Sequence, residues 1–147
     1  MKALVQRVSR ATVSVDGEVV GAIGPGLVVL VGVGRSDADA EARRLAEKVA
    51  ALRIFDDEQG RMGRSLRDLG EGAAALCISQ FTLYGDVRRG TRPSFTEAAE
   101  PQRAIELYEQ FCGDLAEQGV RVETGEFGAR MSLELSNEGP VTLLVET

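Results

Sequence analysis

The sequence predicts an α/β fold in which two helices cover one side of curved, mixed but largely antiparallel β layers. Two long apolar runs, residues 27–33 and 73–85, are typical of buried strands. Two other segments repeat apolar residues at helical spacing, and short β-prone stretches joined by turn residues make up much of the rest. Two helices among about eight strands, many of them joined by hairpins, indicate this class of fold.

The first third of the chain is mostly β. Asp16 and Gly17 separate two β-prone runs and form a strong signal for a two-residue hairpin turn. The run at residues 27–33 is apolar on both faces, so we expect it to lie in the middle of a sheet. After the first helix, residues 53–55 are predicted to form a short strand that ends in a turn.

Two helices are expected. Ser36 or Asp37 can cap the first, which should continue to about Leu52. Pro101 suits the first turn of the second. The first helix carries an apolar stripe of Ala42, Leu45, Ala46, Val49 and Leu52. The second repeats Ala104, Ile105, Tyr108, Phe111, Cys112 and Leu115.

Strands also dominate the second half outside the helix. Residues 73–85 are predicted to form a second central strand, which polar residues interrupt near its end. From Met131 onward apolar and polar side chains alternate, as in a strand with one buried face. After Gly139-Pro140, residues 141–146 are predicted to form a last strand. A homodimer would cover the sheet edges that such strands leave open.

The composition is that of an ordinary globular protein. The 147 residues fit a single domain spanning residues 1–147. No run approaches the roughly 18 apolar residues of a membrane span. The apolar start is broken at Gln6 and Arg7, too early for a secretory signal. We therefore expect a cytoplasmic protein.

The chain contains no histidine. This excludes an intrachain Ser-His-Asp or Cys-His arrangement and any His-ligated metal site, so hydrolytic chemistry would have to proceed without an imidazole. Cys77 lies in an apolar run and Cys112 in a helical pattern, so both are expected to be reduced core or near-core residues rather than disulfide or metal partners.

The net charge of -6 argues against binding to nucleic acid, because phosphate binding depends on Lys and Arg. The positive charge is nevertheless concentrated, since residues 1–15 and residues 59–93 each carry a net charge of +3. The remaining segments together carry -12. This distribution permits a local anionic ligand without demonstrating one.

The first candidate site is the motif "SQFT", residues 79–82, at the exit of the buried strand. Its hydroxyls either satisfy neighbouring backbone groups or belong to a pocket. In a pocket, the backbone N–H groups of Phe81 and Thr82 would stabilise a developing oxyanion, with Thr82 against the reacting carbonyl. Such a site needs no histidine.

The second candidate is "NEGPVT", residues 137–142. Gly139-Pro140 is either a tight turn between strands or a rigid gate, because glycine lets a ligand approach the main chain and proline fixes φ. The letters alone do not specify a cis or trans bond.

The third candidate is the basic segment "RRGTRPSF", residues 88–95. It is either a solvated surface loop or a contact for a phosphate backbone or a 3′-terminal nucleotide, in which arginine supplies charge-assisted hydrogen bonds.

Taken together, these motifs resemble those of the D-aminoacyl-tRNA deacylase family, also called D-Tyr-tRNA deacylase. The resemblance covers the whole chain and rests on residues 1–33, "SQFTL", "RGTRPSF" and "NEGPVT" in the expected order. It implies hydrolysis of the ester between a D-amino acid and the terminal ribose of tRNA, with L-aminoacyl-tRNA spared. It also implies a homodimer of three-layer β/β/α protomers that needs no metal and no cofactor.

The resemblance assigns the catalytic pocket to Ser79, Gln80, Phe81 and Thr82. Thr82 is a candidate nucleophile, yet the chain offers no identifiable base for it. We favour attack by water assisted by the 2′-hydroxyl of the substrate's own ribose, with backbone donors at Phe81 and Thr82 stabilising the oxyanion.

The resemblance assigns the selectivity of the enzyme to Gly139 and Pro140. These residues match a cis Gly-Pro gate that enters the partner subunit's site, where its carbonyl groups capture the amino group and exclude an L side chain. Arg7 matches a residue that orients this gate, and Met131 matches a pocket-lining position.

Two other functions compete with this interpretation. The same fold serves as the serine-removing editing domain of archaeal-type threonyl-tRNA synthetases, but this chain keeps the Gly-Pro motif and no synthetase is attached. An RNA-binding module without hydrolytic activity is the other alternative, and it leaves the polar residues of "SQFT" on a buried strand unexplained.

Overall fold

The fold is organised around one long strand. In the computed structural model, which describes residues 1–147, β1 (Lys2–Val15) pairs antiparallel with β2 (Glu18–Ile23) and β3 (Gly26–Gly32). It also pairs antiparallel with β8 (Ser132–Glu146) along most of its length. The predicted hairpin turn between β1 and β2 is confirmed, because Asp16 and Gly17 have φ values of 51° and 80°.

The sheet continues beyond β3 by parallel pairing. β3 pairs with β6 (Ala74–Ser79), and β6 pairs with β7 (Arg121–Thr124). A separate two-stranded hairpin joins β4 (Phe55–Asp56) and β5 (Met62–Arg64). The eight strands therefore form a mixed, largely antiparallel arrangement, as predicted.

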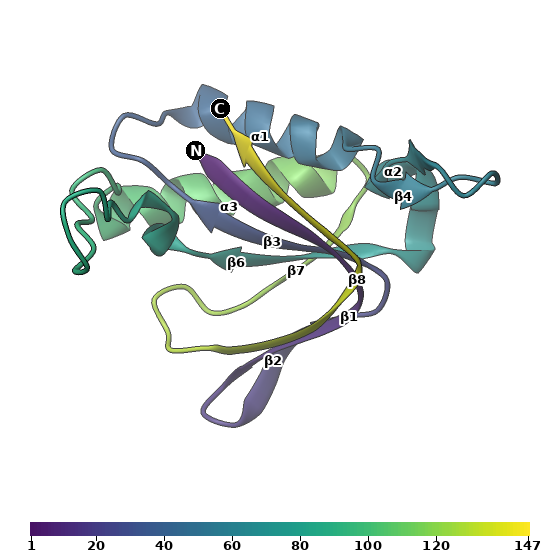
Figure 1. The fold of residues 1–147 in the computed structure, drawn as a ribbon, viewed down its shortest axis with the longest axis horizontal. Helices are drawn as coiled ribbons and strands as arrows, with labels where there is room; N and C mark the ends of the chain where they lie inside the picture. The colour runs from purple at the N-terminus through teal and green to yellow at the C-terminus, as the bar shows by residue number, and fades with distance from the viewer.

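Two long helices lie on one side of the sheet (Figure 1). They are α1 (Asp39–Ala51) and α3 (Pro101–Glu117), with Pro101 at the first turn of α3 as predicted. The remaining helical segments are short: α2 (Leu66–Leu69) and two 3₁₀ turns, η1 (Gly70–Gly72) and η2 (Phe81–Tyr84). None of the helices has the length and apolar character needed to cross a membrane.

Alternating side chains of the central strands face two different cores. Leu27 and Val29 of β3 pack with the buried faces of α1 and α3. Val28, between them, belongs to a second cluster with Val8 and Val13 from β1. A sheet that is covered by helices on one face and by a further β layer on the other accounts for the apolar runs predicted at β3 and β6. The predicted three-layer β/β/α architecture is confirmed (Figure 1).

Three local predictions were wrong. The strand expected over residues 73–85 stops at Ser79, because the chain turns there into η2. The N-cap of α1 is Ala38 rather than Ser36 or Asp37, and the carboxylate of Glu41 accepts the Ala38 N–H at 2.8 Å. In α3 the buried stripe contains Leu107, which was missed, and Ile105 is only half-buried, whereas Cys112 is half-buried and packs against the core.

Candidate functional site

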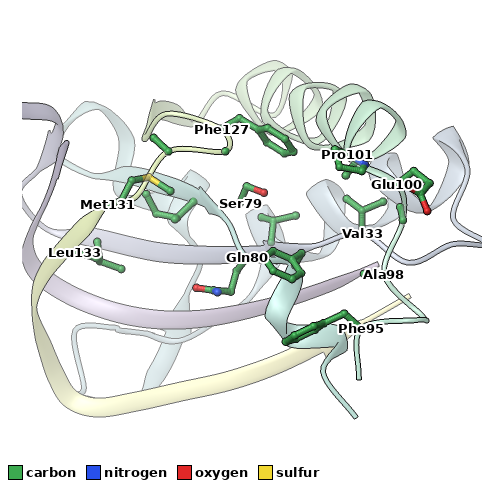
Figure 2. A pocket seen from close by; sticks show the side chains of 17 residues that line it. Val33, Ser79, Gln80, Phe95, Ala98, Glu100, Pro101, Phe127, Met131 and Leu133 are labelled. Carbon is green, nitrogen blue, oxygen red and sulfur yellow. The ribbon is translucent and has the colours of Figure 1, made fainter. Parts of the chain in front are cut away.

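A pocket of about 600 Å³ opens beside the end of β6 (Figure 2). Twelve of its 17 lining residues are hydrophobic, so the pocket suits a ligand with a substantial apolar part. Ser79, Gln80, Phe81 and Met131, which the resemblance assigns to the substrate pocket, all line it. The facing wall comes from α3, the segment before it and the loop after β7, and includes Phe95, Pro101, Phe127 and Ala129.

The exit of β6 leaves backbone donors beside this pocket. The N–H of Gln80 donates to the carbonyl oxygen of Val31 at 2.7 Å, after which the chain leaves the sheet. The first N–H bonded within the η2 turn is that of Leu83, which donates to Gln80 at 3.2 Å. The N–H groups of Phe81 and Thr82 precede it and therefore have no acceptor inside the turn.

Phe81 and Phe95 form the rim of the pocket. Their rings meet edge to face, with centroids 5.0 Å apart and planes at 66°, and both stay partly exposed. Thr82 is exposed and does not line the pocket. Its hydroxyl accepts a hydrogen bond from the side-chain amide of Gln80. The structure thus places Ser79, Gln80 and Phe81 at the pocket and leaves Thr82 outside its lining.

A buried network anchors the far end of the η2 turn. The carboxylate of Asp37 accepts hydrogen bonds from the Gly34 N–H at 2.6 Å and the Tyr84 hydroxyl at 3.3 Å. It also forms an ion pair with the ammonium of Met1 at 2.7 Å, and the two side chains are 9% and 0% exposed. Burial and the nearby Asp37 carboxylate raise the pKa of Tyr84, so its phenol stays protonated and keeps donating.

Asp37→Asn should lower the free energy of unfolding by about 3 kcal/mol, because it leaves the buried Met1 ammonium without a charged partner. Urea denaturation measures the change. Asp39→Asn is the matched control: Asp39 pairs with Arg103 but is 69% exposed, so its loss should cost less than about 1 kcal/mol. Equal losses for the two variants would contradict an anchoring role for Asp37.

The Gly-Pro segment lies where β1 and β8 lose their regular pairing. Gln6 pairs with Thr142 and Val8 with Asn137, so residues 138–141 bulge out opposite Arg7. The bond between Gly139 and Pro140 is cis, as the resemblance implies, and both residues are exposed.

Two side chains hold this bulge in place. Arg7, whose side chain is only 11% exposed, donates from Nε to the carbonyl oxygen of Glu138 at 3.0 Å and from Nη1 to that of Ile54 at 2.8 Å. The side-chain oxygen of Asn137 accepts the N–H of Val141 at 2.9 Å. The segment is therefore a projecting turn that is fixed at both ends.

The structure does not bring the two predicted parts of the site together within one protomer. Arg7, Gly139 and Pro140 do not line the pocket that contains Ser79 and Phe81. Instead, Arg7 links the Gly-Pro segment to the β4–β5 side of the molecule, because it also donates to Ile54 and to Asp56 of β4.

Several lining residues were missed by the sequence analysis. Glu100 is the only charged residue that lines the pocket, and residues 127–129 form part of one wall. The glycines around "GEFGARM" were the available signal for a loop there, but nothing in the sequence placed that loop against β6. No group of three or more His, Cys, Asp or Glu side chains is arranged to hold a metal ion.

Comparisons with known proteins agree along the full chain. The family model of D-Tyr-tRNA(Tyr) deacylase matches residues 4–146. A D-aminoacyl-tRNA deacylase of Symbiobacterium thermophilum is 57% identical over 100% of this chain and 96% of its own length. The D-aminoacyl-tRNA deacylase of Heliobacterium modesticaldum is 58% identical over 99% of this chain and 96% of its own length.

Solved structures show the same fold. The structure of a c-Myc DNA unwinding element binding protein superposes with a TM-score of 0.93 at 39% identity, covering 100% of this chain and 99% of the other. A probable eukaryotic D-amino acid tRNA deacylase superposes with a TM-score of 0.83 at 20% identity, covering 99% and 98%, and supports the fold alone.

Proposed function

The chain belongs to the D-Tyr-tRNA(Tyr) deacylase family of hydrolases, and on this premise we propose that it hydrolyses the ester of D-aminoacyl-tRNA and spares the L form. The products would be free tRNA and a D-amino acid, which amounts to chiral proofreading in translation. The observation that carries this proposal is the apolar pocket at the exit of β6, which Phe81 lines and beside which the η2 turn begins. The same pocket would admit glycyl-tRNA, because glycine has no side chain for a chiral gate to reject.

Catalysis would depend on main-chain donors and on the substrate. As water attacks the ester carbonyl, negative charge develops on its oxygen, and the N–H groups of Phe81 and Thr82 are available to stabilise it. The 2′-hydroxyl of the terminal ribose adjoins the ester and can assist the attacking water. The chain has no histidine, and the proposed steps require none.

Selectivity would come from a second subunit. The exposed Gly139-Pro140 turn does not line its own protomer's pocket, so we expect it to enter the pocket of a partner in a homodimer. There its carbonyl groups would accept hydrogen bonds from the substrate's ammonium group and occupy the space that an L side chain needs. Leu143 and Leu144, which follow on β8 and are 40% and 54% exposed, supply apolar surface for such an interface.

Thr82→Ala should keep kcat/KM for D-Tyr-tRNA within about threefold of the wild-type value. The reason is that the Thr82 hydroxyl is exposed, has only the Gln80 amide as a partner and lies outside the pocket lining, whereas the substitution preserves the backbone N–H. Steady-state deacylation kinetics measure the effect, with thermal melting as the control for folding. A near-complete loss in a folded variant would count against the water mechanism and leave Thr82 as a candidate nucleophile.

Nucleic-acid binding without hydrolysis is the alternative, and it is favoured by the 39% identity to a protein named for binding a DNA element. The net charge of -6 opposes it for a long duplex. Incubating the purified protein with D-Tyr-tRNA and with L-Tyr-tRNA separates the two functions. Loss of the D ester alone supports the deacylase, whereas survival of both esters with retained RNA binding supports the alternative.

A further inference from the structure

A second, smaller cavity of about 280 Å³ lies next to the pocket and has the opposite character. No hydrophobic residue lines it. Its six lining residues are Asp86, Arg88, Arg89, Arg92, Ser94 and Thr96. Three arginines against one aspartate leave this cavity with a net charge of +2 on a chain whose overall charge is -6.

The arginines are not equally free. Arg88 is committed to Asp86: its Nε and Nη2 donate to the two carboxylate oxygens at 2.9 and 2.7 Å. These bonds hold the pKa of Asp86 at about 2, so the carboxylate stays charged and the ion pair with Arg88 stays intact at neutral pH. Arg89 and Arg92 form no ion pair and no side-chain hydrogen bond within the chain. The cavity therefore keeps two guanidinium groups for an external anion.

The loop that carries these groups is held in shape by its own backbone. Asp86 and Ser94 exchange two hydrogen bonds, N–H to O, at 2.8 and 3.0 Å, which closes the loop at its base. Gly90 has a φ of 147°, which a side chain would strain, and lets the chain reverse at the tip. A loop fixed in this way loses less entropy on binding a ligand than a free one.

The two cavities share a wall that is one residue thick. Ser94 and Thr96 line the polar cavity, while Phe95, between them, lines the pocket and packs on Phe81. If the reactive end of a molecule lies in the pocket, the part of the molecule next to that end would therefore lie against Arg89 and Arg92. In a substrate that ends in an esterified ribose, that portion is the phosphate backbone.

We infer that Arg89 and Arg92 bind phosphates of the single-stranded 3′ end of the RNA substrate, with the hydroxyls of Ser94 and Thr96 as additional donors. This inference rests on the proposed function, because it places the ester of the same RNA in the adjacent pocket. It also explains how a protein with a net charge of -6 accepts an RNA, because the phosphate contact is confined to one basic cavity.

The test uses the double variant Arg89→Gln/Arg92→Gln. The control is a second double variant that also removes two positive charges, Arg43→Gln/Arg61→Gln. Arg43 on α1 and Arg61 in the β4–β5 turn are exposed and form no ion pair. Fluorescence anisotropy measures, across a salt series, the binding of an RNA hairpin that has a single-stranded 3′-CCA end and carries no amino acid. Kinetics use D-Tyr-tRNA and, as a substrate without phosphate, the 3′-D-tyrosyl ester of adenosine.

The Arg89/Arg92 variant should bind the hairpin about 10-fold more weakly, and the slope of log K against log salt should become about 1.4 less negative, since each single-strand phosphate contact contributes about 0.7. Its kcat/KM should fall for D-Tyr-tRNA and stay unchanged for the adenosine ester. The control should match the wild type in every measurement.

Each other result overturns a specific claim. If the Arg89/Arg92 variant binds the hairpin with wild-type affinity and salt slope, or if the control loses as much, the phosphate site is wrong while the proposed function stands. If the variant also loses activity on the adenosine ester, the loop shapes the pocket instead of binding phosphate. If the wild type binds the hairpin through these arginines but hydrolyses neither ester, the proposed function fails and the phosphate site stands.

Discussion

Gly139→Ala is expected to lower kcat/KM for D-Tyr-tRNA by about 100-fold, because it displaces the turn that we propose as the selectivity gate. Gly139 has a φ of 129°, where a residue with a side chain is strained. A Cβ at this position would also lie 2.9 Å from Cγ2 of Val141 and 3.1 Å from Nη2 of Arg7. Arg7 holds the bulge in place and Val141 is buried at its end, so neither can move without shifting the turn itself.

The same substitution tests whether the gate acts across a dimer. Ala129 lines the pocket and is half-buried, so Ala129→Trp should fill the pocket and abolish activity by a different route. If the gate enters the partner's pocket, a mixed dimer of the two variants has one site with both parts intact. Random 1:1 mixing after co-refolding should then restore about a quarter of wild-type activity.

A gate that served its own protomer's pocket would give the opposite result. Every mixed dimer would then have one site with a damaged gate and one with a filled pocket, and mixing would restore nothing. Size-exclusion chromatography of each variant provides the control, because both must still form the same oligomer as the wild type. A monomeric wild type with full activity would contradict the cross-subunit gate altogether.

The sequence specified the layers of the fold because burial determines them. The runs at β3 and β6 are apolar on both faces, and only a position between two layers buries both faces of a strand. The end of β6 was not predictable in the same way. Phe81 and Leu83 continue the apolar pattern of the strand, but Gly32 lets the η2 turn pack against the end of β3, with a Cβ there lying 3.1 Å from Leu83. That close approach is tertiary and leaves no local signal.

The candidate site was predictable only in part for a similar reason. "SQFT" and Met131 were identified from their residue types and from the resemblance. Ser79, Gln80, Phe81 and Met131 line the pocket, whereas Thr82 does not. The wall formed by residues 98–101 and 127–129 depends on how α3 and the loop after β7 pack on the sheet, and no short-range pattern encodes that packing. The separation of Gly139-Pro140 from the pocket likewise follows from the path of β8.

Phe81→Pro is expected to lower kcat/KM by a further factor of about 100 relative to Phe81→Ala, which is the effect of removing one oxyanion donor. Both variants lose the aromatic ring and its contact with Phe95, but only proline lacks the backbone N–H. The site tolerates proline, because Phe81 is the first residue of a helical turn and Gln80 before it has φ -143° and ψ 78°, outside the helical region that a following proline disfavours.

The comparison of these two variants isolates the main chain as a catalytic group. Single-turnover kinetics on D-Tyr-tRNA should show the loss in the chemical step, while the KM of the two variants should agree, because the donor acts on charge that develops only in the transition state. Urea denaturation checks that both are folded to a similar extent. Equal rates for Phe81→Pro and Phe81→Ala would exclude the Phe81 N–H as an oxyanion donor and leave that role to Thr82, whose N–H both variants keep.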